Sequence, residues 1–257
     1  HRYYVLSSPV ISDAEYDRRY RELQKLEEEF PQFIRPDSPT RRVGARPLES
    51  FRVIKHRLPM LSLTNAMDEA ELREFDAQVR RFLEKEAPET GEIEYTLEYK
   101  FDGVAMSLTY QDGVLISGAT RGDGFEGEDV TSNIKTIKSI PLRLRGRKDF
   151  RGIFEVRGEV IFLKRDFERL NAERVAKGEE PFANPRNSAS GSLRQLDPSI
   201  MAARPLSFFA YALGTVEVEL PDNHFDCMQM LKEAGFRTSP LFEKVRNVEA
   251  LLETYRK

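Results

Sequence analysis

One lysine in the sequence is placed as a nucleophile would be. Lys100 ends the alternating segment "EYTLEYK", and the next three residues are "FDG", with Asp102 and Gly103. Alternation along a strand predicts that Glu98 and Lys100 share a face, and a glycine directly afterwards permits a sharp turn. A lysine amine that is partly deprotonated and aimed at an electrophile forms covalent intermediates. On its own, however, a Lys-x-Asp-Gly pattern is more often an ordinary cross-strand salt bridge.

A glycine-rich segment follows about twenty residues later. The stretch "ATRGDGFEGED" (119–129) contains G-x-G-x-x-G at Gly122, Gly124 and Gly127. We reject a dinucleotide-fold interpretation, because that fingerprint needs an apolar helix starting at the loop and the acidic side chains here would repel phosphate. Two interpretations remain: a flexible glycine loop, or a loop in which Arg121 binds a ligand.

Charged residues form a row in the otherwise apolar segment "GIFEVRGEVIF". Glu155, Arg157 and Glu159 alternate and so share one face of a predicted strand. A solvent-exposed face would explain the row. Alternatively, Glu159 reaches a ribose hydroxyl or a metal ion.

A fourth segment, "FANPRNSASGSLRQLDP" (182–198), is rich in small and amide residues and carries Arg186 and Arg194 eight positions apart. It is either a structural loop or a place where these arginines contact phosphate. A Gly-Lys-Ser/Thr phosphate loop is absent from the sequence.

Bulk composition limits the function classes. The 257 residues include 40 Lys+Arg and 43 Asp+Glu, for a net charge of −3, and 40% are hydrophobic. Without a long apolar run or a signal peptide, we expect a soluble, cytoplasmic protein with no membrane contact. Cys227 is alone and the three histidines show no ligand spacing, so no residue is assigned as a metal ligand. A nucleic-acid contact would need a local basic face, for which the arginine-rich segment 141–152 is one hypothesis and a solvated basic turn the alternative.

The remaining pattern predicts an α+β fold rather than a doubly wound one. Helices are predicted over 12–30, 68–86, 164–178 and 224–236, and strands over 95–100, 104–110, 114–120, 152–162 and 205–218. Ser12 with Glu15, and Asp68 with Glu71, fit helix-capping signals, and Asp112-Gly113 predicts a tight hairpin. The segment 35–47 carries three prolines and reads as an extended linker. We therefore expect a small helical domain over 1–48 and a larger domain over 49–257.

In order, Lys-x-Asp-Gly, "TRGDG" and "EVRGE" resemble the nucleotidyltransferases that form a lysyl-AMP or lysyl-GMP intermediate. The segments "VISDAEYDRRYREL", "RPDSPTRRVGA", "PMLSL" and "NPRNSASGSLRQLDP" narrow the resemblance to the bacterial NAD-dependent DNA ligases, over nearly the whole chain. This resemblance implies a nucleotidyltransferase (ATP-grasp-like ligase) fold of antiparallel sheets flanked by helices, preceded by a small helical domain.

The resemblance also implies roles for particular residues. Lys100 would attack the adenylyl phosphorus of NAD, with Asp102 as an acidic helper in the same motif. The adenosine pocket would be lined by Glu98, Arg121, Glu159, Ser62 and Leu63. The nicotinamide mononucleotide half would be held by the N-terminal domain, through Tyr3, Tyr4, Asp13, Ala14, Glu15, Tyr16 and Asp17. Arg186 and Arg194 would lie near phosphates or DNA.

The cofactors implied are NAD and magnesium, and the partner is nicked double-stranded DNA, bound by a monomer. An ATP-dependent ligase or capping-type enzyme, and a non-catalytic nucleotide-binding scaffold, are the alternatives. The chain starts without Met and "LLETYRK" ends inside a predicted helix, so we expect a fragment. Since the family's last lysine motifs are missing, we expect it to bind parts of NAD but to self-adenylate poorly and not to seal nicks.

Overall fold

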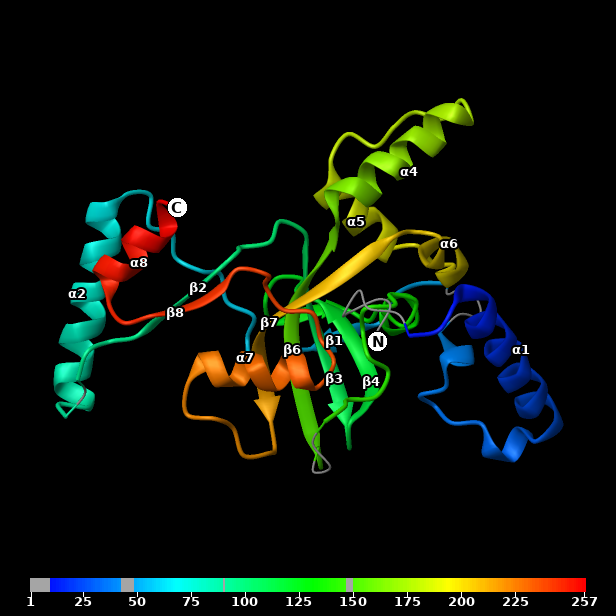
Figure 1. The fold of residues 1–257 in the computed structure, drawn as a ribbon, viewed down its shortest axis with the longest axis horizontal. Coiled ribbons are helices and arrows are strands. Elements are labelled where there is room, and N and C mark those ends of the chain that lie inside the picture. The colour runs from blue at the N-terminus through cyan, green and yellow to red at the C-terminus, as the bar shows by residue number, and fades with distance from the viewer. Residues whose placement is uncertain (1–9, 43–48, 90, 147–149) are drawn as a thin grey trace. The chain divides into compact units, whose positions relative to one another are not determined.

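The computed structural model describes residues 10–42, 49–89, 91–146 and 150–257, and of Asp13 and Ala14 only the backbone. Helices and antiparallel strand pairs are mixed without regular alternation, as Figure 1 shows, which confirms the predicted α+β class. The described helices are α1 Asp13–Glu29, α2 Glu69–Glu86, α3 Thr131–Ile134, α4 Lys164–Ala176, α5 Pro185–Leu193, α6 Pro198–Ala202, α7 His224–Glu233 and α8 Val248–Tyr255. The described strands are β1 Val53–Lys55, β2 Tyr95–Glu98, β3 Val104–Gln111, β4 Val114–Thr120, β5 Glu126–Glu128, β6 Ile153–Phe162, β7 Leu206–Val216 and β8 Phe242–Val245.

Local signals place most of these elements. Ser12 accepts a hydrogen bond from the Glu15 amide at 3.2 Å, and Asp68 accepts one from the Glu71 amide at 2.9 Å, so both predicted helix starts are confirmed. The hairpin between β3 and β4 turns at Asp112 and Gly113, whose φ angles of 50° and 75° are those of a type I′ turn.

A four-stranded sheet in the order β4-β3-β6-β7 forms the centre of the fold. Side chains alternate across it. On β3, Met106, Leu108 and Tyr110 are 0% exposed and face the apolar core, to which α7 and Phe236 contribute. The opposite face of the sheet carries Glu155 and the other charged residues of β6. The sheet therefore has one apolar face and one polar face.

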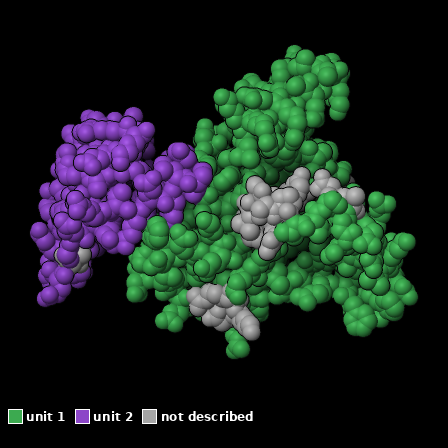
Figure 2. Space-filling view, viewed as in Figure 1, with its two compact units in different colours: residues 1–60, 101–238 green, residues 61–100, 239–257 purple. Residues whose placement is uncertain are grey.

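The described chain divides into two compact units, coloured in Figure 2. Unit 1 holds residues 1–60 and 101–238, including the central sheet. Unit 2 holds residues 61–100 and 239–257. Each unit is therefore assembled from separate stretches of sequence.

Unit 2 is built on the antiparallel pair β2–β8 with α2 and α8. Asp76 is buried on α2, where it accepts hydrogen bonds from Arg80 at 2.8 Å and from the Tyr95 hydroxyl at 2.5 Å. These bonds tie α2 to β2. The Arg80 bond lowers the pKa of Asp76, and burial raises the pKa of Tyr95.

The predictions for two loop segments were wrong. The described part of the segment 35–47, residues 35–42, is not simply extended, because Pro39–Arg41 forms a 3₁₀ turn and Arg42 donates to the carbonyls of Lys135, Ile137 and Ile140. Residues 43–47 of the predicted linker lie outside the described residues. The segment 182–198 is mostly helical, since it forms α5 and ends at Pro198, the first residue of α6.

Candidate active site

A row of predicted site residues crosses the polar face of the central sheet. Ala105 on β3 is opposite Glu159 on β6, and Glu159 is opposite Phe209 on β7. At the other side of β3, the Arg121 amide donates to the Ala105 carbonyl at 3.0 Å. Residues in one cross-strand row share a face of the sheet. The row therefore brings Arg121 and Glu159, 38 positions apart in sequence, to the same part of unit 1.

The lysine motif adjoins this row. The Gly103 amide donates to the Glu159 carboxylate at 3.2 Å, joining segments 56 residues apart. A side chain at position 103 would collide with the Val160 carbonyl and the Ile161 side chain, which explains the glycine. Asp102 lies one residue before Gly103 and accepts a hydrogen bond from Arg186 at 2.8 Å.

Lys100 itself is exposed and lies outside a strand. β2 ends at Glu98, because the next amide, that of Tyr99, donates to the Ser239 hydroxyl at 3.1 Å instead of continuing the strand ladder. The prediction that Glu98 and Lys100 share a strand face was therefore wrong. Lys100 is the last residue of the first segment of unit 2.

The glycine loop is a compact turn that presents Arg121. Gly122 and Gly124 have positive φ angles of 55° and 99°, and a side chain at Gly127 would collide with the Thr120 carbonyl. His56 lies with Nε2 3.1 Å from the Arg121 carbonyl oxygen, which further fixes the loop. The glycines are thus required by close backbone approach, and β5 begins within this segment rather than a phosphate-binding helix.

The two predicted phosphate-contacting arginines lie at opposite ends of α5. Arg186 pairs with Asp102, and Arg194 pairs with Glu128 at 2.8 Å. The side chains in the first pair are 60% and 75% exposed, so this pair is open to solvent. Such pairs contribute little to stability and exchange partners readily.

The charged row on β6 is only partly a surface feature. Glu155 is 2% exposed and accepts hydrogen bonds from Ser107 at 2.7 Å and from the Thr215 amide at 3.1 Å. Arg157 also donates to it, at 3.0 Å. The interpretation of the row as a solvated face is therefore wrong at Glu155.

The same Arg157 fixes the chain at the start of the "PMLSL" segment. Its guanidinium donates to the carbonyls of Leu58 at 2.5 Å and Pro59 at 2.9 Å. The Met60 amide donates in turn to the Gly124 carbonyl at 2.8 Å. This positioning role was missed in the sequence, because no local pattern connects Arg157 to residues about a hundred positions away.

Tyr211 is a second residue that the sequence did not single out. The β6–β7 pairing shifts register between Arg157 and Gly158, where one additional β7 residue is accommodated. Such a bulge re-aims side chains beside functional sites. Burial, and then the nearby Glu159 carboxylate, raises the pKa of the Tyr211 phenol to about 12. An aromatic ring thus lies near the carboxylate–arginine row.

The N-terminal prediction is described only in part. Tyr3 and Tyr4 lie outside the described residues, and Asp13 and Ala14 open α1. Tyr16 is 46% exposed, and its ring is stacked on that of Tyr20 at 6.2 Å between centroids. The other two predicted residues follow the same first turns: Asp17 is exposed, whereas Glu15 accepts hydrogen bonds from Arg18 and Arg19. These bonds, that of Arg19 first, lower the pKa of Glu15.

Three further predicted residues belong to unit 2. Ser62 and Leu63 are exposed and outside regular secondary structure, and Leu63 is 76% exposed. Glu98 is half-buried at the end of β2, opposite Phe242 of β8.

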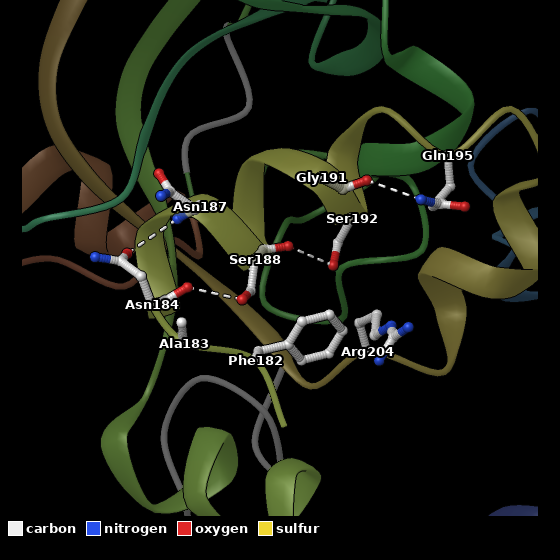
Figure 3. A pocket seen from close by; sticks show the side chains of 9 residues that line it. All are labelled: Phe182, Ala183, Asn184, Asn187, Ser188, Gly191, Ser192, Gln195 and Arg204. Carbon is white, nitrogen blue, oxygen red and sulfur yellow. Dashed lines mark hydrogen bonds between the residues drawn. The ribbon is translucent and has the colours of Figure 1, made fainter. Parts of the chain in front are cut away.

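α5 also lines a cavity of about 310 Å³, shown in Figure 3. Its wall consists of Phe182, Ala183, Asn184, Asn187, Ser188, Gly191, Ser192, Gln195 and Arg204. The hydroxyls of Ser188 and Ser192 donate back to carbonyls four residues earlier, at 2.7 Å each. The hydroxyls of these two serines are therefore satisfied within the helix. None of the predicted site residues lines it.

Within the described residues, no three His, Cys, Asp or Glu side chains are grouped closely enough to hold a metal ion. Over the same residues, none of the helices is both long and apolar enough to cross a membrane.

The Lys-x-Asp-Gly turn and the carboxylate–arginine row contain the motifs that resemble the nucleotidyltransferase class, and comparison with known proteins shows the family. The family model described as "NAD-dependent DNA ligase adenylation domain" matches residues 48–257. The model described as "DNA ligase-like, N-terminal NAD+-binding domain" matches residues 1–44. The chain therefore belongs to the NAD-dependent DNA ligase family, which confirms the resemblance seen in its motifs.

Relatives named DNA ligase agree with this. The chain is 52% identical over 254 residues to the protein from Nitrosococcus oceani, covering 98% of this chain and 37% of that relative. It is 50% identical over 256 residues to the protein from Hahella chejuensis, covering 100% and 37%, and 52% identical over 254 residues to that from Geotalea daltonii, covering 99% and 38%. The chain thus spans a little over a third of the length of these curated relatives.

Proposed function

We propose that this chain contributes the adenylate acceptor, Lys100, and the NAD-binding residues to the self-adenylation step of an NAD-dependent DNA ligase. The observation that carries the proposal is the hydrogen bond from the Gly103 amide to Glu159. This bond attaches the lysine motif to the row that contains Glu159 and Arg121. A ligand bound by that row would therefore lie near Gly103, three residues after Lys100.

The proposed reaction is a phosphoryl-type transfer. Lys100 Nζ, after losing a proton to solvent, attacks the adenylyl phosphorus of NAD. A phosphorus–nitrogen bond forms, the pyrophosphate phosphorus–oxygen bond breaks, and nicotinamide mononucleotide leaves with the electron pair. Such a transfer depends on positioning and charge neutralisation. In the whole ligase, the adenylate then passes to the 5′-phosphate of a nick, and attack by the 3′-hydroxyl releases AMP and closes the phosphodiester.

The row supports an adenosine site. Glu159 offers carboxylate oxygens to ribose hydroxyls, Arg121 adds positive charge, and Tyr211 supplies an aromatic face on which a nucleobase stacks. We assign Glu98, Ser62 and Leu63 to the same site from the family resemblance. Asp102 and Arg186 would act beside the nucleophile, where the exposed guanidinium can leave the carboxylate for a substrate phosphate.

The other half of NAD is assigned to the domain over residues 1–48, with 49–257 as the adenylation domain. The half-exposed Tyr16 ring supports this assignment, because tyrosine faces attract a pyridinium cation. Tyr3 and Tyr4 would add further rings, and the carboxylates of Asp13 and Asp17 would add attraction. Ala14 and Glu15 are assigned to the same site from the family resemblance.

Magnesium would bind mainly through the phosphates of NAD and water, with at most one or two protein carboxylates. The donors present fit this, since Asp102 and Glu159 provide hard oxygen ligands beside the lysine motif. When bound, the ion would neutralise developing phosphate charge. Nicked DNA as partner, a cytoplasmic location and a monomeric state complete the proposal.

DNA contact through Arg186 and Arg194 is part of the proposal, whereas the segment 141–152 is supported less. Arg143 in that segment pairs with Asp37, so its charge is already engaged within the chain. Arg147 of this segment lies outside the described residues. If salt-dependent binding of nicked duplex is unaffected by neutralising Arg143, Arg145 and Arg147, the segment has no such role.

The test is intact mass after incubation with NAD and magnesium, followed by peptide mapping, on a ligase polypeptide that contains this chain. We expect a gain of one adenylyl group on Lys100 and none in Lys100→Ala, while a matched variant of a remote lysine, Lys232→Ala, keeps it. ATP in place of NAD is expected to give no adduct. Adenylation elsewhere, or with ATP alone, would contradict the proposal.

A further inference from the structure

The nucleophile lies at a point where the chain passes from one compact unit to the other. Such passages occur after Met60, after Lys100 and after Thr238. Lys100 therefore ends a segment of unit 2, and Phe101 begins a segment of unit 1. The backbone position of a nucleophile at such a passage depends on what holds the chain on each side.

On the unit 1 side, a contact between two aromatic rings holds the chain. The ring of Phe101 lies 4.5 Å from that of Phe209 between centroids, tilted by 32°. Phe209 is 8% exposed on β7, an edge strand of the central sheet, and this burial makes it a rigid support. Pairs of this geometry are attractive beyond the area they bury. The residue after the nucleophile is thus attached to β7.

The Phe209 ring also lies near a residue that precedes another passage, the one after Thr238. The Arg237 guanidinium lies 5.9 Å from the Phe209 ring centroid, within the range of cation–π attraction. The Arg237 carbonyl accepts a hydrogen bond from Ala210 at 2.8 Å, one residue along β7. Since Thr238 is the last residue of unit 1, Phe209 contacts residues beside two of the three passages.

Phe209 is also coupled to the lysine motif through its strand neighbour. It is opposite Glu159 on β6, and Glu159 accepts the hydrogen bond from Gly103. Phe101 and Gly103 are therefore held by two side chains that face each other across adjacent strands. The two residues flanking Asp102 are fixed in this way.

We propose that Phe209 is a positioning residue for the Lys100 nucleophile, acting through Phe101. The inference rests on the proposed function. Phe209 would contribute to alignment of the amine for attack, and would matter little once adenylate is on DNA, because Lys100 is then no longer a reactant. A misplacement of about 1 Å by a remote substitution can lower a rate by about 100-fold.

The test compares two reactions in variants of a ligase polypeptide that contains this chain. We expect Phe209→Leu to lower the single-turnover rate of lysyl-AMP formation at saturating NAD by about 10- to 100-fold, with KM for NAD changed less than about twofold. Sealing of a synthetic, already adenylated nick is expected to stay within about twofold. The matched control is Phe208→Leu, one residue earlier on β7, which packs against Phe236 in the apolar core and is expected to leave the ratio of the two rates unchanged.

A second pair of variants keeps the test independent of how well Phe209→Leu folds. Phe101→Leu is expected to reproduce the selective loss, whereas Phe101→Tyr, which keeps the ring, is expected to retain most of the rate. Equal losses in both reactions, or full-rate adenylation in Phe209→Leu and Phe101→Leu, would overturn the inference. If the wild-type protein acquires no adenylate on Lys100, the proposed function itself fails.

Discussion

Two arginine–carboxylate pairs in unit 1 differ sharply in burial. In the Glu155–Arg157 pair the side chains are 3% and 13% exposed, and in the Asp102–Arg186 pair they are 75% and 60% exposed. Glu155 accepts three hydrogen bonds, and Arg157 also donates to two main-chain carbonyls. The buried pair is a fixed part of the fold, because each of its members has several partners that water cannot replace.

The exposed pair has the opposite character. Water solvates both groups, so separating them costs little. A substrate phosphate could therefore take the place of Asp102 on Arg186 without destabilising the fold. Burial, rather than the presence of an ion pair, therefore separates the residues that build this site from those that can act in it.

The largest expected effect is on the buried pair. Glu155→Ala removes one partner and leaves the Arg157 guanidinium buried, so we expect a loss of about 3–5 kcal/mol in the free energy of unfolding. Urea unfolding of the 257-residue chain measures it. Glu128→Ala is the matched control at an exposed pair, with an expected change below about 1 kcal/mol. Similar losses in the two variants would remove the distinction.

Gly214 provides a second test of how closely the Glu155 side chain is packed. A side chain at this position would collide with the carboxylate of Glu155. We expect Gly214→Ala to cost about 1–3 kcal/mol by overpacking. In the double variant with Glu155→Ala the additional cost of Gly214→Ala should largely disappear, because the obstructing carboxylate is gone. Additive losses would show that the two residues do not share this space.

A buried carboxylate in unit 2 provides a pH-dependent case. The bond from Arg80 lowers the pKa of Asp76 below its ordinary value of 3.8 in the folded protein. The unfolded chain thus binds this proton more readily, and the stabilisation is present above about pH 4 and lost as pH falls through the folded pKa. We expect Asp76→Asn to cost about 1–2 kcal/mol at pH 7 and much less at pH 2 to 3. An equal cost at both pH values would contradict this.

The smallest stability effect is expected at the exposed pair. Arg186→Ala should change the free energy of unfolding by less than about 0.5 kcal/mol. Its adenylation rate should nevertheless fall by about tenfold or more, because a phosphate-contacting charge is lost. Thermal unfolding and single-turnover adenylation measured on the same preparation separate the two. A loss above about 1 kcal/mol would mean that this pair also belongs to the fold.

Local chemistry made part of the structure predictable. The helix starts at Ser12 and Asp68 and the Asp112-Gly113 hairpin depend on residues within four positions of one another, and each is confirmed. α5 was missed because serines, glycine and amides weaken its periodicity. Its start was nevertheless readable, since Asn184 caps the helix and Pro185 occupies the first turn.

The site was predictable in its members but not in its connections. Glu159 could be singled out from its strand pattern, but its bond to Gly103 spans 56 residues and depends on how β3 and β6 align. The bulge at Tyr211 and the contact between Phe101 and Phe209 likewise arise from strand register. A tight turn fixes register within a hairpin, but register between strands that are far apart in sequence also depends on which faces pack together in the fold.

The central claim is that the amine of Lys100 takes up adenylate from NAD. Peptide mapping by mass spectrometry, after a short incubation of the ligase polypeptide with NAD and magnesium, tests it most directly. We predict a single adenylyl group on the peptide containing Lys100 and the release of one equivalent of nicotinamide mononucleotide. An unmodified Lys100 in a protein that seals nicks with NAD would contradict it.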